Sequence, residues 1–298
     1  MESVLFFLLL VLIDVHRPFV KLSFFSLKPF MIGMVIVGGV LILRAMANRK
    51  LPYHFWGSPI FLPVAVFILI VIIGSTLQAK NISRSYVLVM ALLFFFFLYL
   101  MLYQFTRTLL IKHTLFLVCM AGALLGLISI ATYVLALSGV IPALDFVLLG
   151  SPNLGEFSGA PRMIGLNNDP NLSAMDISVY LMVSLSVLTS FGLDKKVMYS
   201  ALLCSVLAGV SLLATLSRGG ILGVLVGIAF LLFFNRQRVL AIFLRNSWKF
   251  VIVGVCFTML FLFVVPRDSI NSLVDRMSTF SYNKEFNGTI DPIGCGLT

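Results

Sequence analysis

The 298-residue sequence contains few charged residues, four cysteines and only three histidines. Charged residues make up 11% of the chain and hydrophobic residues 60%, and the mean hydropathy is +1.11. Soluble domains carry about 25% charged residues, so this composition excludes an ordinary soluble protein and is typical of a membrane protein. No long polar block separates the apolar segments, so we expect no attached soluble domain.

The sequence also lacks the common signatures of bound cofactors. No pair of cysteines has the spacing of a metal or redox site, and no phosphate-binding loop or dinucleotide fingerprint is present. We therefore expect neither a cofactor nor a metal. The net charge is +10, but the basic residues are scattered between apolar runs. This pattern indicates membrane orientation rather than nucleic-acid binding. Glu2 takes the place of a basic leader region, which argues against a secretory signal.

Long apolar runs are what the sequence has in abundance. A membrane helix needs about 20 apolar residues and satisfies its own backbone hydrogen bonds, so continuous runs of this length predict helices. We therefore predict an all-α, polytopic transmembrane bundle of about nine helices over residues 1–265, followed by a polar segment, 266–298. The predicted spans are 4–13, 29–47, 59–78, 86–105, 114–138, 172–191, 198–217, 219–235 and 248–265.

The basic connections predict an orientation. Residues 106–113, 192–197 and 236–249 all carry lysine or arginine, and they fall on one side if every run from 114 onward crosses once. The positive-inside rule makes that side cytoplasmic. The long segment 139–171 then forms an outer loop, with the junction at Ser217–Arg218 on the same face.

The first third of the chain fits this orientation less well. Arg17, Lys21 and Lys28 would lie outside, against the positive-inside rule. Either this loop has a function, or the first short run does not span the membrane.

One polar stretch interrupts the apolar pattern, RMIGLNNDPNLSA at 162–174. Asp169, followed by Pro170 and Asn171, predicts a capped helix start. Capping does not explain Arg162, because the dipole at a helix N-terminus is already positive. Two interpretations remain open: Arg162 binds an anion such as phosphate, or it extends to lipid headgroups.

Arg218 lies at a junction between two apolar runs that is too short for a loop. An ionisable residue so close to hydrocarbon is costly and usually has a partner or faces a polar cavity. Its planar guanidinium suits a diphosphate, although an interfacial turn arginine is the alternative. Since the orientation places Arg162 and Arg218 on one face, we expect the two to bind a diphosphate together.

Few residues are candidates for acid–base chemistry. Asp176 lies about one turn inside the helix that begins near 172, and it is a counter-ion to one of the arginines or a catalytic base. Asn171 belongs to the same polar group. His54 and His113 fall on the cytoplasmic side, so His16 is the only outer histidine.

Glycines recur every fourth residue in two apolar runs. They are Gly122 and Gly126 in one run, and Gly219, Gly223 and Gly227 in the other. Small residues at this spacing let membrane helices approach closely. We expect these glycines to serve helix packing and not chemistry.

The polar motifs resemble those of the O-antigen ligase/polymerase family. The resemblance rests on RMIG at 162–165 before DPN at 169–171, on TLSRGG at 215–220 and on DPIGCG at 291–296. It covers residues 150–296, and the earlier helices match only in being hydrophobic.

The resemblance implies a bacterial inner-membrane, GT-C-like glycosyltransferase that uses no metal or nucleotide. Such proteins transfer a glycan from undecaprenyl diphosphate to an acceptor on the periplasmic face. The acceptor is lipid A-core for a ligase and a second lipid-linked glycan for a polymerase. The family's outer-face arginines bind the diphosphate, and they correspond here to Arg162 and Arg218.

One departure from the family pattern concerns the general base. Family members carry a histidine in a large outer loop, whereas no histidine follows His113 here. The catalytic base is therefore unidentified, and we expect a fragment or a truncated, inactive version. Two other functions stay open: a transporter or flippase for an anionic lipid-linked glycan, which needs no base, and a non-catalytic membrane scaffold.

Overall fold

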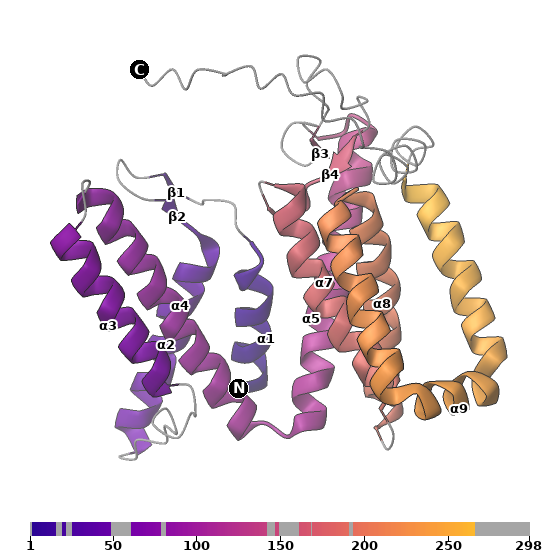
Figure 1. Cartoon of the computed structure of the whole chain (residues 1–298), viewed down its shortest axis with the longest axis horizontal. Coiled ribbons are helices and arrows are strands. Elements are labelled where there is room, and N and C mark those ends of the chain that lie inside the picture. Colours follow the sequence, from indigo (N-terminus) through magenta and orange to yellow (C-terminus); the bar gives the residue numbers. More distant parts are fainter. Residues whose placement is uncertain are drawn as a thin grey trace, which may run out of the picture.

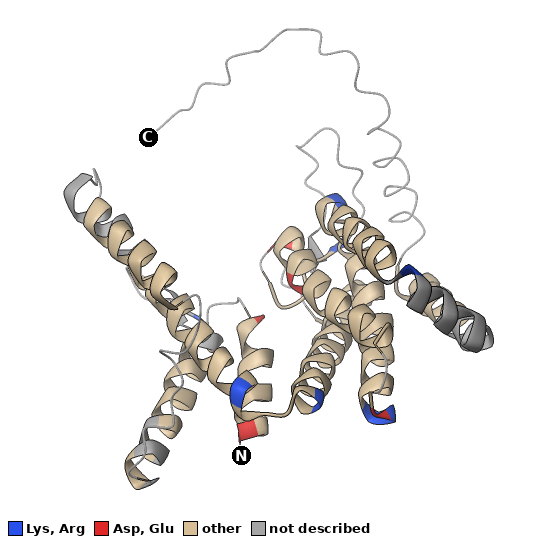
Figure 2. Ribbon diagram, turned by 60° about the horizontal axis from the view of Figure 1, so that its bottom comes forward, with Lys and Arg blue, Asp and Glu red and all other residues tan. Residues whose placement is uncertain are grey.

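The structure is a computed structural model that describes residues 2–15, 20–21, 26–48, 61–78, 82–141, 147–148, 161–167, 169–190 and 193–265. Helices make up 86% of these residues. They stand side by side in Figure 1, and Figure 2 shows that charged residues are sparse along them. The expected helical class is confirmed.

The first helices follow the predicted spans closely. They are α1 (Glu2–Ile13), α2 (Pro29–Asn48), α3 (Phe61–Gln78) and α4 (Ile82–Thr108). α1 packs against α2 and α5, and α3 packs against α4. α1 therefore joins the first helices to the second group (Figure 1).

The second group is α5 (Ile111–Leu137), α7 (Pro170–Leu188), α8 (Lys195–Ala214) and α9 (Arg218–Val264). Among the described residues, α5, α7 and α8 are long and apolar enough to cross a membrane. They coincide with three of the predicted spans, which supports a membrane protein. The other apolar helices are shorter by this measure.

Two short antiparallel ladders accompany the helices. β1 (Val20–Lys21) pairs with β2 (Ser26–Leu27). β3 (Val147–Leu148) pairs with β4 (Arg162–Met163), so that Leu148 lies opposite Arg162. The second ladder holds part of segment 139–171 beside the end of α5.

α9 contains both of the last two predicted spans. The sequence predicted two spans joined by a basic connection at 236–249, and in the structure the spans and the connection belong to one helical element of 47 residues. Figure 1 shows α9 running down the bundle, turning at its lower end and returning upward. The connection contains no glycine or proline, which agrees with its helical backbone.

Glycine and serine allow α5 to pack closely against α7 and α8. A Cβ on Gly122 would lie 2.7 Å from both Cys204 Sγ and Tyr180 Cβ, and one on Gly126 would lie 3.1 Å from the backbone carbon of Leu207. Ser211 Oγ donates to the Gly126 carbonyl oxygen at 3.2 Å. The predicted packing role of these two glycines is confirmed.

The glycines of α9 only partly follow the prediction. A Cβ on Gly227 would meet Met182 at 2.6 Å, but one on Gly219 or Gly223 would meet nothing within 4 Å. Among the described residues, Gly219 and Gly223 therefore make no close helix contact, so the predicted packing face is not seen at these two positions. Gly220 makes the close contact instead, with Ala174 Cβ at 2.7 Å.

The two ends of the second group differ in character. Lys112, at the start of α5, lies 3.4 Å from Asp194, which precedes α8, and both side chains are exposed. This ion pair confirms that the predicted basic connections 106–113 and 192–197 share one end, which we call the basic end. Figure 1 shows the turn of α9 at the basic end, and β3, β4 and the starts of α7 and α9 at the opposite one, the loop end.

Candidate functional site

The candidate site lies at the loop end, where a three-residue turn joins α8 to α9. Thr215, Leu216 and Ser217 form this turn, and all three are buried. Leu216 has a φ of 51°, a left-handed conformation that costs a non-glycine residue about 1–2 kcal/mol. Backbone strain of this kind persists only where the surroundings impose it, and it is common at functional sites.

Arg162 contacts this turn directly. Its Nε donates to the Thr215 carbonyl oxygen at 3.0 Å, and its Nη2 donates to Asn171 Oδ1 at 3.4 Å. Tyr133 Oη supports the preceding residue by donating to the Pro161 carbonyl oxygen at 3.1 Å. Arg162 therefore lies over the α8–α9 turn, although 53 residues separate it from Thr215 along the chain.

Asn171 connects the two helix starts. Its Oδ1 accepts from Arg162 and also from Ser217 Oγ, at 3.1 Å. Ser217 is the N-cap residue of α9, and its Oγ accepts from the Gly220 amide at 3.3 Å. One amide oxygen thus links β4, α7 and the cap of α9.

The N-terminus of α7 is already neutralised by the protein itself. Asp169 is its N-cap residue, and Asp169 Oδ1 accepts from the amides of Asn171 at 2.7 Å and Leu172 at 3.2 Å. Pro170 occupies the first helical position. The capping role that the sequence predicted for Asp169 is confirmed, so these α7 amides are not available to an external anion.

The N-terminus of α9 offers a different environment. Its cap is the neutral Ser217, and its first turn carries no acidic residue. Arg218 is the first helical residue, and Gly219 beside it is exposed with open space around its Cα. The first amides of a helix have no intrahelical partner, and the dipole there favours an anion.

The structure therefore places the Arg162 guanidinium beside the α8–α9 turn. Arg218 follows this turn as the first residue of α9. Both arginines lie at the loop end, on the same side of the bundle, as the sequence predicted. Guanidinium groups and helix N-termini are both groups that bind anions with several oxygens. No family model, curated protein or solved structure matches this chain.

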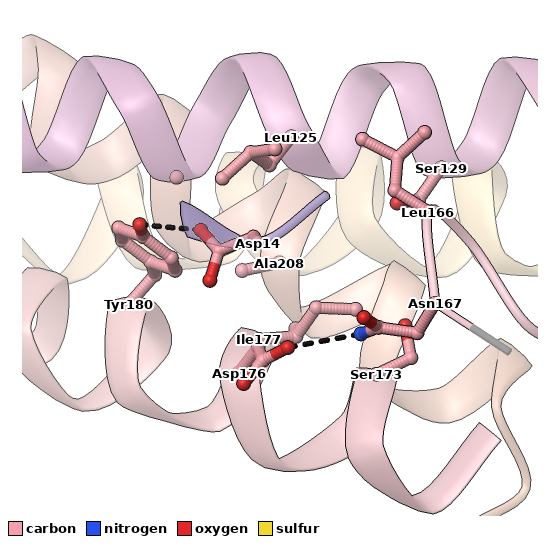
Figure 3. A pocket seen from close by; sticks show the side chains of 11 residues that line it. Asp14, Leu125, Ser129, Leu166, Asn167, Ser173, Asp176, Ile177, Tyr180 and Ala208 are labelled. Carbon is pink, nitrogen blue, oxygen red and sulfur yellow. Dashed lines mark hydrogen bonds between the residues drawn. The ribbon is translucent and has the colours of Figure 1, made fainter. Parts of the chain in front are cut away.

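A second polar region lies deeper, between α1, α5 and α7. Here the residues 165–167 lead into a small cavity of about 20 Å³, shown in Figure 3. Asp14, Asn167, Asp176 and Tyr180 provide its polar groups, together with the hydroxyls of two serines, Ser129 and Ser173.

Hydrogen bonds hold the carboxylates of this cavity. Tyr180 Oη donates to Asp14 Oδ2 at 2.6 Å, and Asn167 Nδ2 donates to Asp176 Oδ2 at 2.9 Å. Asp176 was predicted as a counter-ion to Arg162 or Arg218, or as a base. The structure places it beside Asn167 and in the lining of the same cavity as Asp14 (Figure 3), and either role stays a prediction.

Gly165 shapes the approach to this cavity. It has a φ of 64°, and a Cβ there would lie 2.9 Å from Ser173 Oγ and 3.0 Å from Ser129 Oγ. The turn at Gly165 therefore allows Arg162 to contact the α8–α9 turn while Asn167, five residues later, lines the cavity.

Sequence reasoning missed Asp14, Asn167 and Tyr180. An aspartate at the end of an apolar run was a usable signal for Asp14, because charges inside membrane spans are seldom incidental. Nothing in the sequence showed that α1 would lie beside α7. Three expected elements, His16, the outer segment 266–298 and its motif at 291–296, lie outside the described residues.

Proposed function

We propose that this chain is a glycosyltransferase of the bacterial inner membrane, of the O-antigen ligase or polymerase type. It binds the diphosphate of an undecaprenyl-linked glycan at the loop end, which faces the periplasm. Arg162 and Arg218 hold the diphosphate oxygens and stabilise the charge that develops on the leaving group. The acceptor is lipid A-core or a second lipid-linked glycan.

The observation that carries the proposal is the bond from Arg162 to the Thr215 carbonyl oxygen. This bond places a guanidinium at the α8–α9 turn, three residues before Arg218. Because Asp169 already caps α7, the anion is expected at the start of α9. A diphosphate has enough oxygens to use both arginines and the first amides of this helix.

The proposal includes a topology. We infer nine membrane crossings, α1 to α5, α7, α8 and the two limbs of α9. The loop end is then outside, and the basic end is cytoplasmic. Lys112 and the connection at 236–249 lie at the basic end, which agrees with the positive-inside rule.

Binding of a polyprenyl diphosphate tests the arginines directly. The full chain is reconstituted in nanodiscs, and its affinity for undecaprenyl diphosphate is compared with that for undecaprenyl monophosphate. We expect the diphosphate to bind more tightly. Loss of a hydrogen-bonded charge costs about 1.5–3 kcal/mol, so Arg162→Ala and Arg218→Ala should each weaken binding by roughly 10- to 100-fold.

Two further variants make this experiment specific. Arg162→Lys and Arg218→Lys should also bind the diphosphate weakly, because lysine keeps the charge but lacks the planar pair of donors. Lys196→Ala is the matched control, since Lys196 is exposed and lies in the first turn of α8 at the basic end. Equal losses in Lys196→Ala and Arg218→Ala would mean that charge in general, not this site, attracts the lipid.

A transporter or flippase of an anionic lipid-linked glycan is the second candidate. The observation that favours it is the pair of aspartates lining a cavity among the helices, because ionisable groups inside membrane proteins often mark transport paths. Glycan transfer to an acceptor by the purified protein would exclude it. Movement of the lipid-linked glycan between leaflets without transfer would support it.

A further inference from the structure

The cavity between α1, α5 and α7 has the properties of an ion site. Its volume of about 20 Å³ is room for a single particle of the size of water. The six polar side chains that line it present mostly oxygen atoms, and among the described residues no lysine or arginine lines it. In Figure 3 the carboxyl groups of Asp14 and Asp176 both lie at this space.

One atom of the lining is unsatisfied. Asn167 is 3% exposed, and its Oδ1 has no hydrogen-bond partner although its Nδ2 donates to Asp176. An unpaired buried carbonyl oxygen costs about 1–3 kcal/mol. If the Asn167 amide were flipped, its Oδ1 would lie against the Asp176 carboxylate, and two acceptor oxygens would face each other without a hydrogen. The free Oδ1 therefore requires a donor or a cation in the cavity.

The surroundings favour positive charge. Asp176 lies six residues after the start of α7 at Pro170, about 9 Å along the helix axis. Asp14 directly follows the C-terminal end of α1 at Ile13, where the helix dipole is negative. The carboxylates of Asp14 and Asp176 lie among packed helices, where they stabilise a cation more strongly than they would in water.

We propose that this cavity binds one sodium ion. Asn167 Oδ1 and Asp176 are the central ligands, and Asp14 with the hydroxyls of Ser129 and Ser173 completes the oxygen shell. A hydrated divalent ion does not fit, because magnesium loses its water shell reluctantly and needs more room. Bound sodium would connect α1 to α7 and residues 165–167, and so hold the segment that carries Arg162.

The experiment measures stability in sodium. The purified full chain is heated in chloride salts of sodium, potassium and N-methylglucamine at equal ionic strength. We expect the melting temperature to rise with sodium along a saturation curve, as for a ligand that binds the folded state. Potassium should act more weakly because the cavity is small. No excess effect of sodium over N-methylglucamine would overturn the proposal and leave water as the occupant.

Two substitutions and a control assign the effect to the cavity. Asp176→Asn keeps the shape and removes the charge, and Asn167→Ala removes the unsatisfied oxygen. Both should abolish the sodium response, whereas Asp194→Asn, at the exposed basic end, should retain it. A full response in Asp176→Asn would overturn the proposal. If either variant fails to fold, equilibrium binding of radioactive sodium to the wild-type chain decides, with one ion per chain expected and none contradicting it.

Discussion

Gly122→Ala tests how tightly α5 must approach its neighbours. The added Cβ would lie 2.7 Å from Cys204 Sγ and from Tyr180 Cβ, well inside contact distance. All three residues are buried, so the clash cannot be relieved toward lipid. We expect α5 to move away from α7 and α8, and Tyr180 to shift from Asp14.

The magnitude follows from two opposing terms. Overpacking a close helix contact costs about 1–3 kcal/mol, and replacing a helical glycine with alanine returns up to about 1 kcal/mol. With the full return the net loss should be up to about 2 kcal/mol, which at its upper end changes the ratio of folded to unfolded protein by about 30-fold. Gly223→Ala meets no atom within 4 Å, so only the favourable term applies there.

Thermal unfolding of both variants in a mild detergent checks the reasoning. Gly122→Ala should melt below the wild type, and Gly223→Ala at or above it. Adding Cys204→Ala to Gly122→Ala should restore part of the loss, because it removes one of the three clashing atoms, the others belonging to Tyr180. Equal melting temperatures for the two glycine variants would show that α5 is not packed as described.

Three further changes probe the polar segment. Asp169→Ala should lower the stability by about 1 kcal/mol because two α7 amides lose their acceptor, whereas Asp169→Asn should retain most of it; thermal unfolding measures both. Gly165→Ala should cost about 1–2 kcal/mol for its positive φ alone, and hydrogen exchange should rise in residues 162–167. Tyr133→Phe should weaken polyprenyl diphosphate binding by less than tenfold, since it loses the bond that supports the Pro161 carbonyl oxygen beside Arg162; a larger loss would assign Tyr133 a direct role.

The sequence predicted the helices well because membrane spans have a strong physical signal. Apolar length alone located α5, α7 and α8 within three residues at each end, since lipid demands that each span form its own hydrogen bonds. The cap at Asp169 was also predictable, because capping depends on neighbours in the chain. The two spans predicted after residue 218 correspond to the two limbs of α9 (Figure 1), and the connection between them is helical because it has no helix breaker.

The candidate site was only partly predictable. Charge and orientation placed Arg162 and Arg218 on one face, but not the bond from Arg162 to Thr215, which depends on the buried turn at Leu216. The cavity was beyond prediction, since it forms only where α1 meets α5 and α7. Helix pairing depends on side-chain packing between distant segments, and one sequence carries no direct signal for it.

The most direct test of the diphosphate site is an experimental structure of the full chain with undecaprenyl diphosphate in nanodiscs. We expect density for the two phosphates at the loop end, beside the Arg162 guanidinium and the first turn of α9. Phosphate density at the basic end, near Lys195 and Lys196, would show that this site does not bind the lipid carrier.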